Sequence, residues 1–219
     1  RLMMGTLLEV QLTADSPAIE ASGLNILFRR IQSLERLWSR FEPTSEIARL
    51  NREGAIAPQA VSPETHIALD LAETYRQQTQ GAFNPRLHGY DLGALGKGLA
   101  LDWAWNDLRA YAPACQVRMN FGGQLFFGEP CPPPAHDIVL DIPGWMGDPP
   151  RIRVPGHGSV STTSQGERPG HVRDPQTGHP ADACLSVTVW AACAADADVW
   201  STALFVRPTL GAIAPVHSW

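Results

Sequence analysis

The stretch Gln116-Val-Arg-Met-Asn-Phe-Gly-Gly-Gln-Leu-Phe-Phe127 marks the point where the sequence changes from helical to strand-like patterns. Residues 116–121 alternate polar and apolar side chains, and residues 124–127 form a second short strand-like run. The adjacent glycines Gly122 and Gly123 permit backbone conformations and close contacts that a side chain would block. The stretch therefore predicts two strands joined by a tight hairpin.

Helical patterns precede this hairpin. Pro17 opens an apolar-periodic stretch that reaches Trp38, and Ser62 followed by Pro63 is typical of a helix start. The predicted helices are Pro17–Trp38, a short one from Pro43 to about Asn51, Ser62–Gly81, and one that follows a glycine-rich turn at 91–98 and ends near Tyr111.

Strand-like runs dominate after the hairpin, and only one precedes the first helix. The further predicted strands are Gly5–Thr13, Ile138–Ile142, Arg151–Val154, Ser159–Thr163 and Ser186–Ala191, and a last helix is expected at Asp196–Val206. This order predicts the α+β class. We expect a single mixed α/β domain over residues 1–219, with early helices, then antiparallel-rich strands, then a C-terminal helix.

Charge and hydropathy exclude several classes of protein. The net charge is −5, and the only lysine among the 17 basic residues is Lys97, so no basic stripe suits a nucleic acid. No apolar run is long enough to be a transmembrane segment. The four cysteines, Cys115, Cys131, Cys184 and Cys193, have no zinc spacing, and we expect buried or free thiols.

Three motifs carry weak chemical signals when each is taken alone. Asp198 and Thr202 are four residues apart on the last predicted helix, so their oxygens share a face and could hold one hard cation. Residues 91–98 offer a carboxylate, small residues and Lys97 where a helix begins, a place suited to anions, although the pattern is not a Walker A loop. His171 is a titratable group before an Asp-Pro turn. A solvated helix face, a packing turn and a surface histidine are the alternatives.

Taken together, these motifs resemble the FAD:protein FMN transferase family, the ApbE-type flavin transferases. The matching pieces, in the family's order, are Met4-Gly-Thr6, Ser39–Asn51, Gly81-Ala-Phe-Asn-Pro85, Asp91–Asp102, Asn120-Phe-Gly-Gly123, Ser161-Thr-Thr-Ser164, His171–Gly178 with Pro180, and Ser186–Val189 followed by Ala197–Phe205.

The resemblance implies an enzyme that binds FAD in a cleft and moves its FMN half onto a threonine of an acceptor protein, with Mg²⁺ at the pyrophosphate and release of AMP. It implies that the metal ligands are the Ala94 carbonyl, the Asp198 carboxylate and the Thr202 hydroxyl. The flavin contacts that it implies are Met4, Phe41, Ala82, Phe83, Asn84, Asp91, Lys97 and His171.

Physical chemistry is consistent with these roles. Displacement at a pyrophosphate phosphorus needs charge neutralisation and placement of the attacking hydroxyl, and an all-oxygen Mg²⁺ site supplies the first. Lys97 would hold a phosphate oxygen as a compact charge, and Phe41 offers an aromatic face. His171 is the first candidate for the base that takes the threonine proton, and Asp91 is its rival.

The sequence departs from the family at several positions. Asn84 and Gln124 stand where family members usually have Asp, and Gly96 stands where they have Ala. Only residues 86–90 separate two motifs that are usually a few tens of residues apart, so we expect a shortened connection there, or a segment missing from this sequence.

Two alternatives remain open from the sequence. One is Mg²⁺-dependent hydrolysis of FAD to FMN and AMP, with water in place of the acceptor. The other is a flavin-binding protein without turnover, which the uncharged Asn84 and Gln124 would favour. The acceptor, the oligomeric state and the compartment stay open, with a periplasmic, membrane-associated or cytoplasmic location all compatible with the sequence.

Overall fold

A computed structural model describes residues 1–53, 61–87, 89–129, 135–166, 170 and 172–212. Along the chain its elements are β1 (Leu2–Met3), β2 (Thr6–Thr13), α1 (Pro17–Trp38), α2 (Glu46–Glu53), α3 (Pro63–Gln78), α4 (Gly96–Tyr111), β3 (Gln116–Phe121), β4 (Gln124–Gly128), β5 (His136–Val139), β6 (Arg151–Val154), β7 (Gly158–Ser164), β8 (Ser186–Ala191), α5 (Ala194–Val206) and a 3₁₀ helix at Pro208–Ala212.

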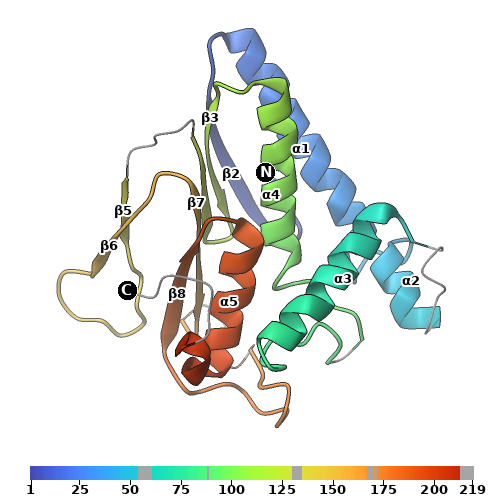
Figure 1. The fold of residues 1–219 in the computed structure, drawn as a ribbon, viewed down its shortest axis with the longest axis vertical. Helices are drawn as coiled ribbons and strands as arrows, with labels where there is room; N and C mark the ends of the chain where they lie inside the picture. The colour runs from blue at the N-terminus through green and yellow to red at the C-terminus, as the bar shows by residue number, and fades with distance from the viewer. Residues whose placement is uncertain (54–60, 88, 130–134, 167–169, 171, 213–219) are drawn as a thin grey trace.

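The main sheet has six strands in the order β1-β2-β3-β4-β7-β8, and every pairing is antiparallel (Figure 1). The β3–β4 hairpin is as predicted, with Phe121 opposite Gln124. Gly122 and Gly123 both have positive φ angles, 60° and 89°, which a two-residue hairpin turn requires and which favour glycine. The strand-like stretch that opens the second half of the sequence therefore forms the middle of the sheet.

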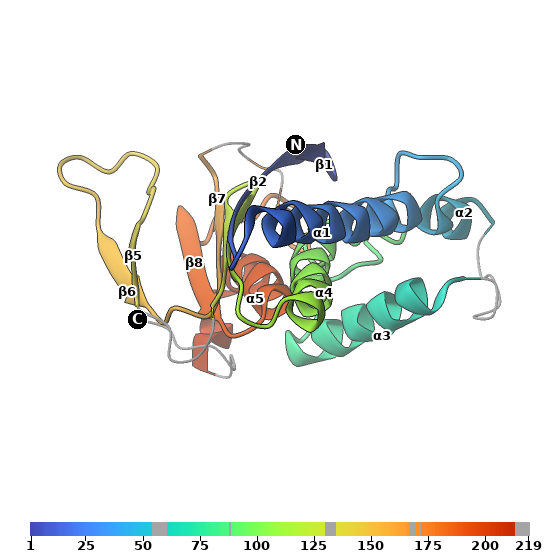
Figure 2. The same cartoon turned by 90° about the horizontal axis from the view of Figure 1, so that it is seen from above.

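Helices α1, α4 and α5 cover one face of the sheet (Figures 1 and 2). Helix α1 begins where the sequence predicts, because the Ser16 hydroxyl accepts the Ile19 N–H at 3.3 Å and Pro17 occupies the first turn. Its fully buried residues Leu27, Ile31 and Leu34 recur at helical spacing and enter the main core. Helix α4 lies between α1 and α5, which brings the start of α4 close to the start of α5.

Strands β5 and β6 form a separate two-stranded sheet on the side of the main sheet away from the helices (Figure 2). Val154 of β6 packs there with Phe127 and Val160 of the main sheet in a second, smaller core. The predicted bounds of β5 were wrong by two residues at the start and three at the end, since the strand covers His136–Val139 rather than Ile138–Ile142. It pairs with Arg151–Val154, with Ile138 opposite Ile152, and both isoleucines pack against the smaller core.

The α+β class is confirmed, as are the antiparallel strands and the C-terminal helix. Among the described residues, no helix has the length and hydropathy needed to cross a membrane. Cys115, Cys184 and Cys193 are free thiols, as expected, and Cys131 lies outside the described residues.

Candidate functional site

Asp91 lies in the turn before α4 with both carboxylate oxygens engaged. Its Oδ1 accepts the Gly93 N–H at 2.8 Å, and its Oδ2 lies 2.5 Å from Nη1 of Arg40. The side chains of Asp91 and Arg40 are 45% and 53% exposed, so this ion pair sits at the surface. The turn is thus closed by its own aspartate and tied to the segment that follows α1.

Asn51, at the end of the Ser39–Asn51 motif, fixes the residue before Asp91. Its side chain accepts the Tyr90 N–H at 2.6 Å and donates to the Tyr90 carbonyl at 2.8 Å. A Cβ atom at Gly89 would lie 2.8 Å from the Asn51 Oδ1, so the approach depends on glycine. Two motifs far apart in the sequence therefore meet side by side.

Phe41 is held at the same surface. Its ring is 81% exposed, and the Arg40 guanidinium lies 4.8 Å from the ring centroid. An aromatic ring this exposed contributes little to the core, so the ring is free to contact a planar ligand beside Asp91.

Lys97 and Asp198 bring the starts of two helices together. Lys97 is the second residue of α4, and its Nζ lies 4.0 Å from Oδ1 of Asp198 in α5. The Lys97 side chain is 27% exposed, whereas that of Asp198 is 6% exposed. The sequence placed these residues in different motifs, and the fold pairs them.

The Asp198 carboxylate is buried without full compensation. Within the part of the chain that the structure describes, its Oδ2 has no hydrogen-bond partner. Burial raises the pKa of Asp198, and the Lys97 charge, the Gly98 N–H and the Ser161 hydroxyl oppose that shift. A buried carboxylate oxygen without a partner is costly, and a bound cation is one way to satisfy it.

Hydroxyl groups of β7 and α5 form a network beside this carboxylate, which the Ser161 hydroxyl contacts. Ser201 donates to Ser161 at 3.2 Å, and Thr163 lies 3.0 Å from the Ser201 oxygen. Thr202 donates its proton to the Asp198 carbonyl at 3.2 Å, so the lone pairs of its oxygen remain available for a cation. The Ser161-Thr-Thr-Ser164 motif of β7 thus faces the second turn of α5.

These groups fit a hard divalent cation. The described residues contain no group of three or more His, Cys, Asp or Glu that could hold a metal, so a cation here would rely on hydroxyl and carbonyl oxygens beside one carboxylate. Asp198 and Thr202 supply such oxygens, and Ala94 is half-buried in the turn that leads to Lys97. An all-oxygen donor set suits Mg²⁺, which keeps several waters and substrate oxygens.

Gln124 connects the glycine hairpin to the start of α5. It is buried, and its Nε2 donates to the Ala194 carbonyl at 2.8 Å and to the Ser159 hydroxyl at 3.2 Å. The amide nitrogen of Gln124 donates to a backbone carbonyl, which an ionised carboxylate at the same place could not do. The departure from the family pattern at Gln124 therefore has a structural consequence at α5.

Met4 lies in the turn between β1 and β2 with a positive φ of 47°. Its N–H donates to Oε1 of Glu35 at 2.6 Å, which fixes the turn on α1. The turn adjoins the glycine hairpin, since a Cβ at Gly122 would lie 2.5 Å from the Thr6 hydroxyl.

The Gly81–Pro85 motif points mainly into the core. Ala82 and Phe83 are 2% and 4% exposed, and the Phe83 ring packs edge-on against Tyr75. Asn84 is half-buried and accepts the Arg86 N–H at 2.9 Å. Any contact of Ala82 or Phe83 with a ligand would therefore come from their backbone rather than from their side chains.

His171 lies outside the described residues, and so does residue 88 of the short connection. Sequence reasoning gave no role to Arg40, which contacts the predicted site residue Asp91. It also gave none to Asn51 and Asp102, which bind backbone groups of Tyr90 and of Ala194 and Ala195. Asn51 and Asp102 close two of the quoted motifs, and that position was the available signal. Nothing local marked Arg40 as the partner of Asp91.

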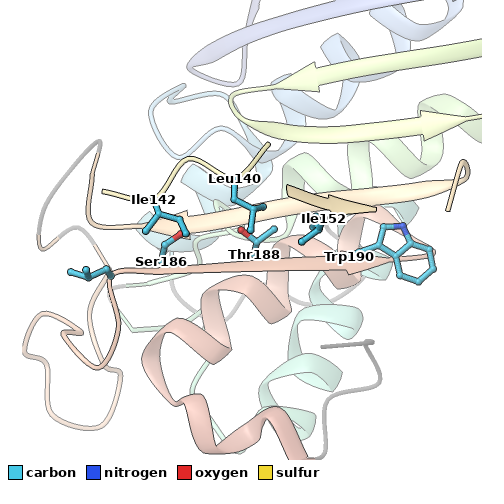
Figure 3. Close-up of a pocket in the computed structure, with 7 residues that line it drawn as sticks. Leu140, Ile142, Ile152, Ser186, Thr188 and Trp190 are labelled. Carbon is cyan, nitrogen blue, oxygen red and sulfur yellow. The ribbon is translucent and has the colours of Figure 1, made fainter. Parts of the chain in front are cut away.

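A hollow of about 390 Å³ lies away from these residues, between β8 and the β5–β6 hairpin (Figure 3). Its walls are Leu140, Ile142, Ile152, Leu185, Ser186, Thr188 and Trp190. Ser186 and Thr188 point into it, while the neighbouring Val187 and Val189 pack in the main core on the helix side. Because strand side chains alternate, the hollow lies on the opposite face of the sheet from Asp198.

Comparison with known proteins gives consistent results. The sequence model of the ApbE family matches residues 4–90 and 88–217, and the two matches meet at 88–90. A curated relative, the FAD:protein FMN transferase of Treponema pallidum (strain Nichols), is 24% identical, with 94% of this chain and 77% of the relative covered. That alignment spans 279 residues, more than the 219 of this chain, so the relative has segments without a counterpart here.

Solved structures share the fold. The ApbE protein of Thermotoga maritima has a TM-score of 0.82 at 20% identity, covering 94% of this chain and 85% of the other. The flavin transferase ApbE of Vibrio cholerae has a TM-score of 0.80 at 19% identity, covering 97% of this chain and 87% of the other.

Proposed function

This chain belongs to the ApbE family, and from that premise we propose that it is an FAD:protein FMN transferase that moves the FMN half of FAD onto a threonine of an acceptor protein. The observation that carries the proposal is the buried Asp198 carboxylate beside Lys97, with one oxygen left without a partner among the described residues. An anionic substrate with a bound cation would satisfy both groups at once.

In the proposed reaction, the acceptor threonine oxygen forms a bond to the phosphorus of the FMN half. The bond from that phosphorus to the oxygen of the AMP phosphate breaks, and AMP leaves. The threonine proton passes to a base. Atoms and charges balance without any oxidant or reductant.

Five residues of the site have parts in this proposal. Asp198, the Thr202 hydroxyl and the Ala94 carbonyl would hold Mg²⁺, which when bound neutralises charge on the pyrophosphate. Lys97 would hold a phosphate oxygen, and the exposed Phe41 ring would contact the flavin.

Two residues compete for the role of base. Both oxygens of Asp91 are engaged, by Gly93 and Arg40, so Asp91 must loosen one contact to take a proton. We therefore propose His171 as the base and Asp91 as the residue that shapes the turn. His171→Asn would then abolish transfer while FAD still binds, whereas Asp91→Asn would weaken FAD binding as well.

The shortened middle of the chain is compatible with this function. We propose one domain over residues 1–219 with a short connection at 86–90. The two family matches overlap at 88–90, and the Asp91 N–H donates to the Pro85 carbonyl at 2.8 Å, so the motifs on either side of the connection are in contact.

The direct test mixes the purified chain with FAD, Mg²⁺ and an acceptor protein that contains a threonine flavinylation motif. We expect the acceptor to gain the mass of FMN less one water and one AMP to be released per transfer, with no reaction in EDTA. An acceptor that stays unlabelled at every Mg²⁺ concentration would exclude transfer. AMP release without acceptor would indicate hydrolysis, and intact FAD would indicate a binding protein.

A further inference from the structure

Helix α5 begins without a strong cap of its own. The residue before it is Cys193, whose Sγ accepts the Asp196 N–H at 3.4 Å, and cysteine is not among the residues that cap helices well. The N–H groups of Ala194 and Ala195 have no partner inside their own helix. Another part of the chain must satisfy them.

Asp102 of α4 supplies the missing acceptors. Its Oδ1 lies 2.7 Å from the Ala194 nitrogen, and its Oδ2 lies 2.9 Å from the Ala195 nitrogen. A negative charge at the N-terminus of a helix is also favoured by the helix dipole. Burial raises the pKa of Asp102 to about 6, and the two N–H donors act against that shift. One side chain therefore caps a helix that begins far along the sequence.

Two further contacts press the same turn of α5 against its neighbours. A Cβ atom at Gly98 would lie 2.5 Å from the Ala194 carbonyl oxygen, so α4 and α5 touch through their backbones. From the sheet, Gln124 donates to the same carbonyl at 2.8 Å. The first turn of α5 is thus held on one side by α4 and on the other by β4.

The candidate site lies next to this junction on both helices. Lys97 directly precedes Gly98, and Asp198 lies one turn after Ala194. We infer that Asp102 is a positioning residue that holds the first turn of α5 and thereby sets Asp198 opposite Lys97. Asp102 acts through Asp198 and not on the substrate itself. The inference rests on the proposed function only for what Asp198 and Lys97 bind.

The experiment compares the full-length wild-type chain with Asp102→Asn and Asp102→Ala, and uses Asp107→Asn as the matched control. Asp107 lies on the same helix with its side chain 48% exposed. Amide hydrogen exchange of residues 194–202 is measured without ligand, Mg²⁺ binding is measured by calorimetry, and AMP release is measured against Mg²⁺ concentration.

We expect exchange in residues 194–202 to become faster in the order wild type, Asn, Ala, because asparagine keeps one acceptor oxygen. Mg²⁺ binding should weaken by about tenfold or more in Asp102→Ala and less in Asp102→Asn, the scale seen when supporting partners of metal ligands are removed. The Mg²⁺ concentration for half-maximal AMP release should rise in parallel. Asp107→Asn should behave as the wild type.

Unchanged exchange in both Asp102 variants would overturn the inference, and so would Mg²⁺ affinity equal to that of the wild type. If Asp102→Ala does not fold, Asp102→Asn decides by the same two measurements. A wild-type chain that never cleaves FAD would refute the proposed function alone. The role of Asp102 would still be supported if the wild type exchanged its amide hydrogens more slowly and bound Mg²⁺ more tightly than the Asp102 variants.

Discussion

The Nζ atom of Lys97 lies 4.0 Å from Oδ1 of Asp198, so the single lysine of the chain faces a buried carboxylate on another helix. Lysine is rare throughout this chain, but composition does not explain why the one lysine lies beside Asp198. The pair joins the start of α4 to α5.

Replacement of Lys97 by arginine should lower kcat/KM for FAD by about tenfold, or about 1.4 kcal/mol. A guanidinium is a planar fork, whereas the space beside Asp198 holds a compact ammonium group. AMP release measures the effect, with the exposed Arg36→Lys as the control for a basic exchange elsewhere. Turnover equal to that of the wild type would remove the argument for a compact charge.

Replacement of Asp198 by asparagine should remove the stabilisation that Mg²⁺ and FAD give together. A ligand at 100 times its dissociation constant stabilises the folded state by about 2.7 kcal/mol, and the variant should gain much less. Thermal unfolding with Mg²⁺ and FAD, compared with EDTA, measures this. Asp107→Asn serves as the control, and an equal gain in the Asp198 variant would place the cation elsewhere.

The glycines on either side of Lys97 should respond in opposite ways to alanine. A Cβ at Gly98 would lie 2.5 Å from the Ala194 carbonyl oxygen, so Gly98→Ala should cost about 1–3 kcal/mol of unfolding free energy. At Gly96 the nearest atoms are 3.6 Å away, so Gly96→Ala should be neutral or stabilise by up to about 1 kcal/mol. Urea unfolding of both variants measures the difference, and equal stabilities would contradict the close approach of α4 and α5.

Asp102 should make the folded state less stable as the pH rises from about 4 to about 6. Burial raises its pKa from 3.8 to about 6, so in this window the folded chain holds a proton that the unfolded chain has lost. A shift of this size corresponds to roughly 2–3 kcal/mol, fully expressed above the folded-state pKa.

The pH effect is isolated by subtracting the unfolding free energies of Asp102→Asn from those of the wild type at each pH, since asparagine does not titrate. We expect the difference to shift against the wild type between pH 4 and pH 6 and to be flat above. The pKa of Glu73 is lowered from 4.5 to about 2, so its contribution to the unfolding free energy changes mainly at lower pH. Both chains contain Glu73, so that contribution cancels in the subtraction. A flat difference across the window would contradict the raised pKa.

Loss of the Phe41 ring should weaken FAD binding severalfold and leave the melting temperature unchanged. The ring is 81% exposed, so Phe41→Ala removes almost no core packing, but it removes an aromatic contact for the flavin. Flavin fluorescence titration and thermal unfolding separate the two effects. Tyr111→Ala, at the far end of α4, is the control, and unchanged FAD affinity in the Phe41 variant would place the flavin away from this surface.

The sequence by itself determined most of the elements and the order of the motifs. Helix α1 and strands β3, β6 and β8 have the predicted bounds, because helix caps and the alternation of side chains are local signals that need no distant partner. The motifs also sufficed to indicate the family.

Tertiary structure decided the register of β5, the start of α5 and the partners inside the site. Strand β5 takes its bounds from pairing with β6, and α5 begins at Ala194 rather than at the predicted Asp196 because Asp102 caps it from α4. The pairs of Lys97 with Asp198 and of Arg40 with Asp91 likewise join residues far apart in the chain. Such contacts depend on the order of strands and the packing of helices, which local patterns do not encode.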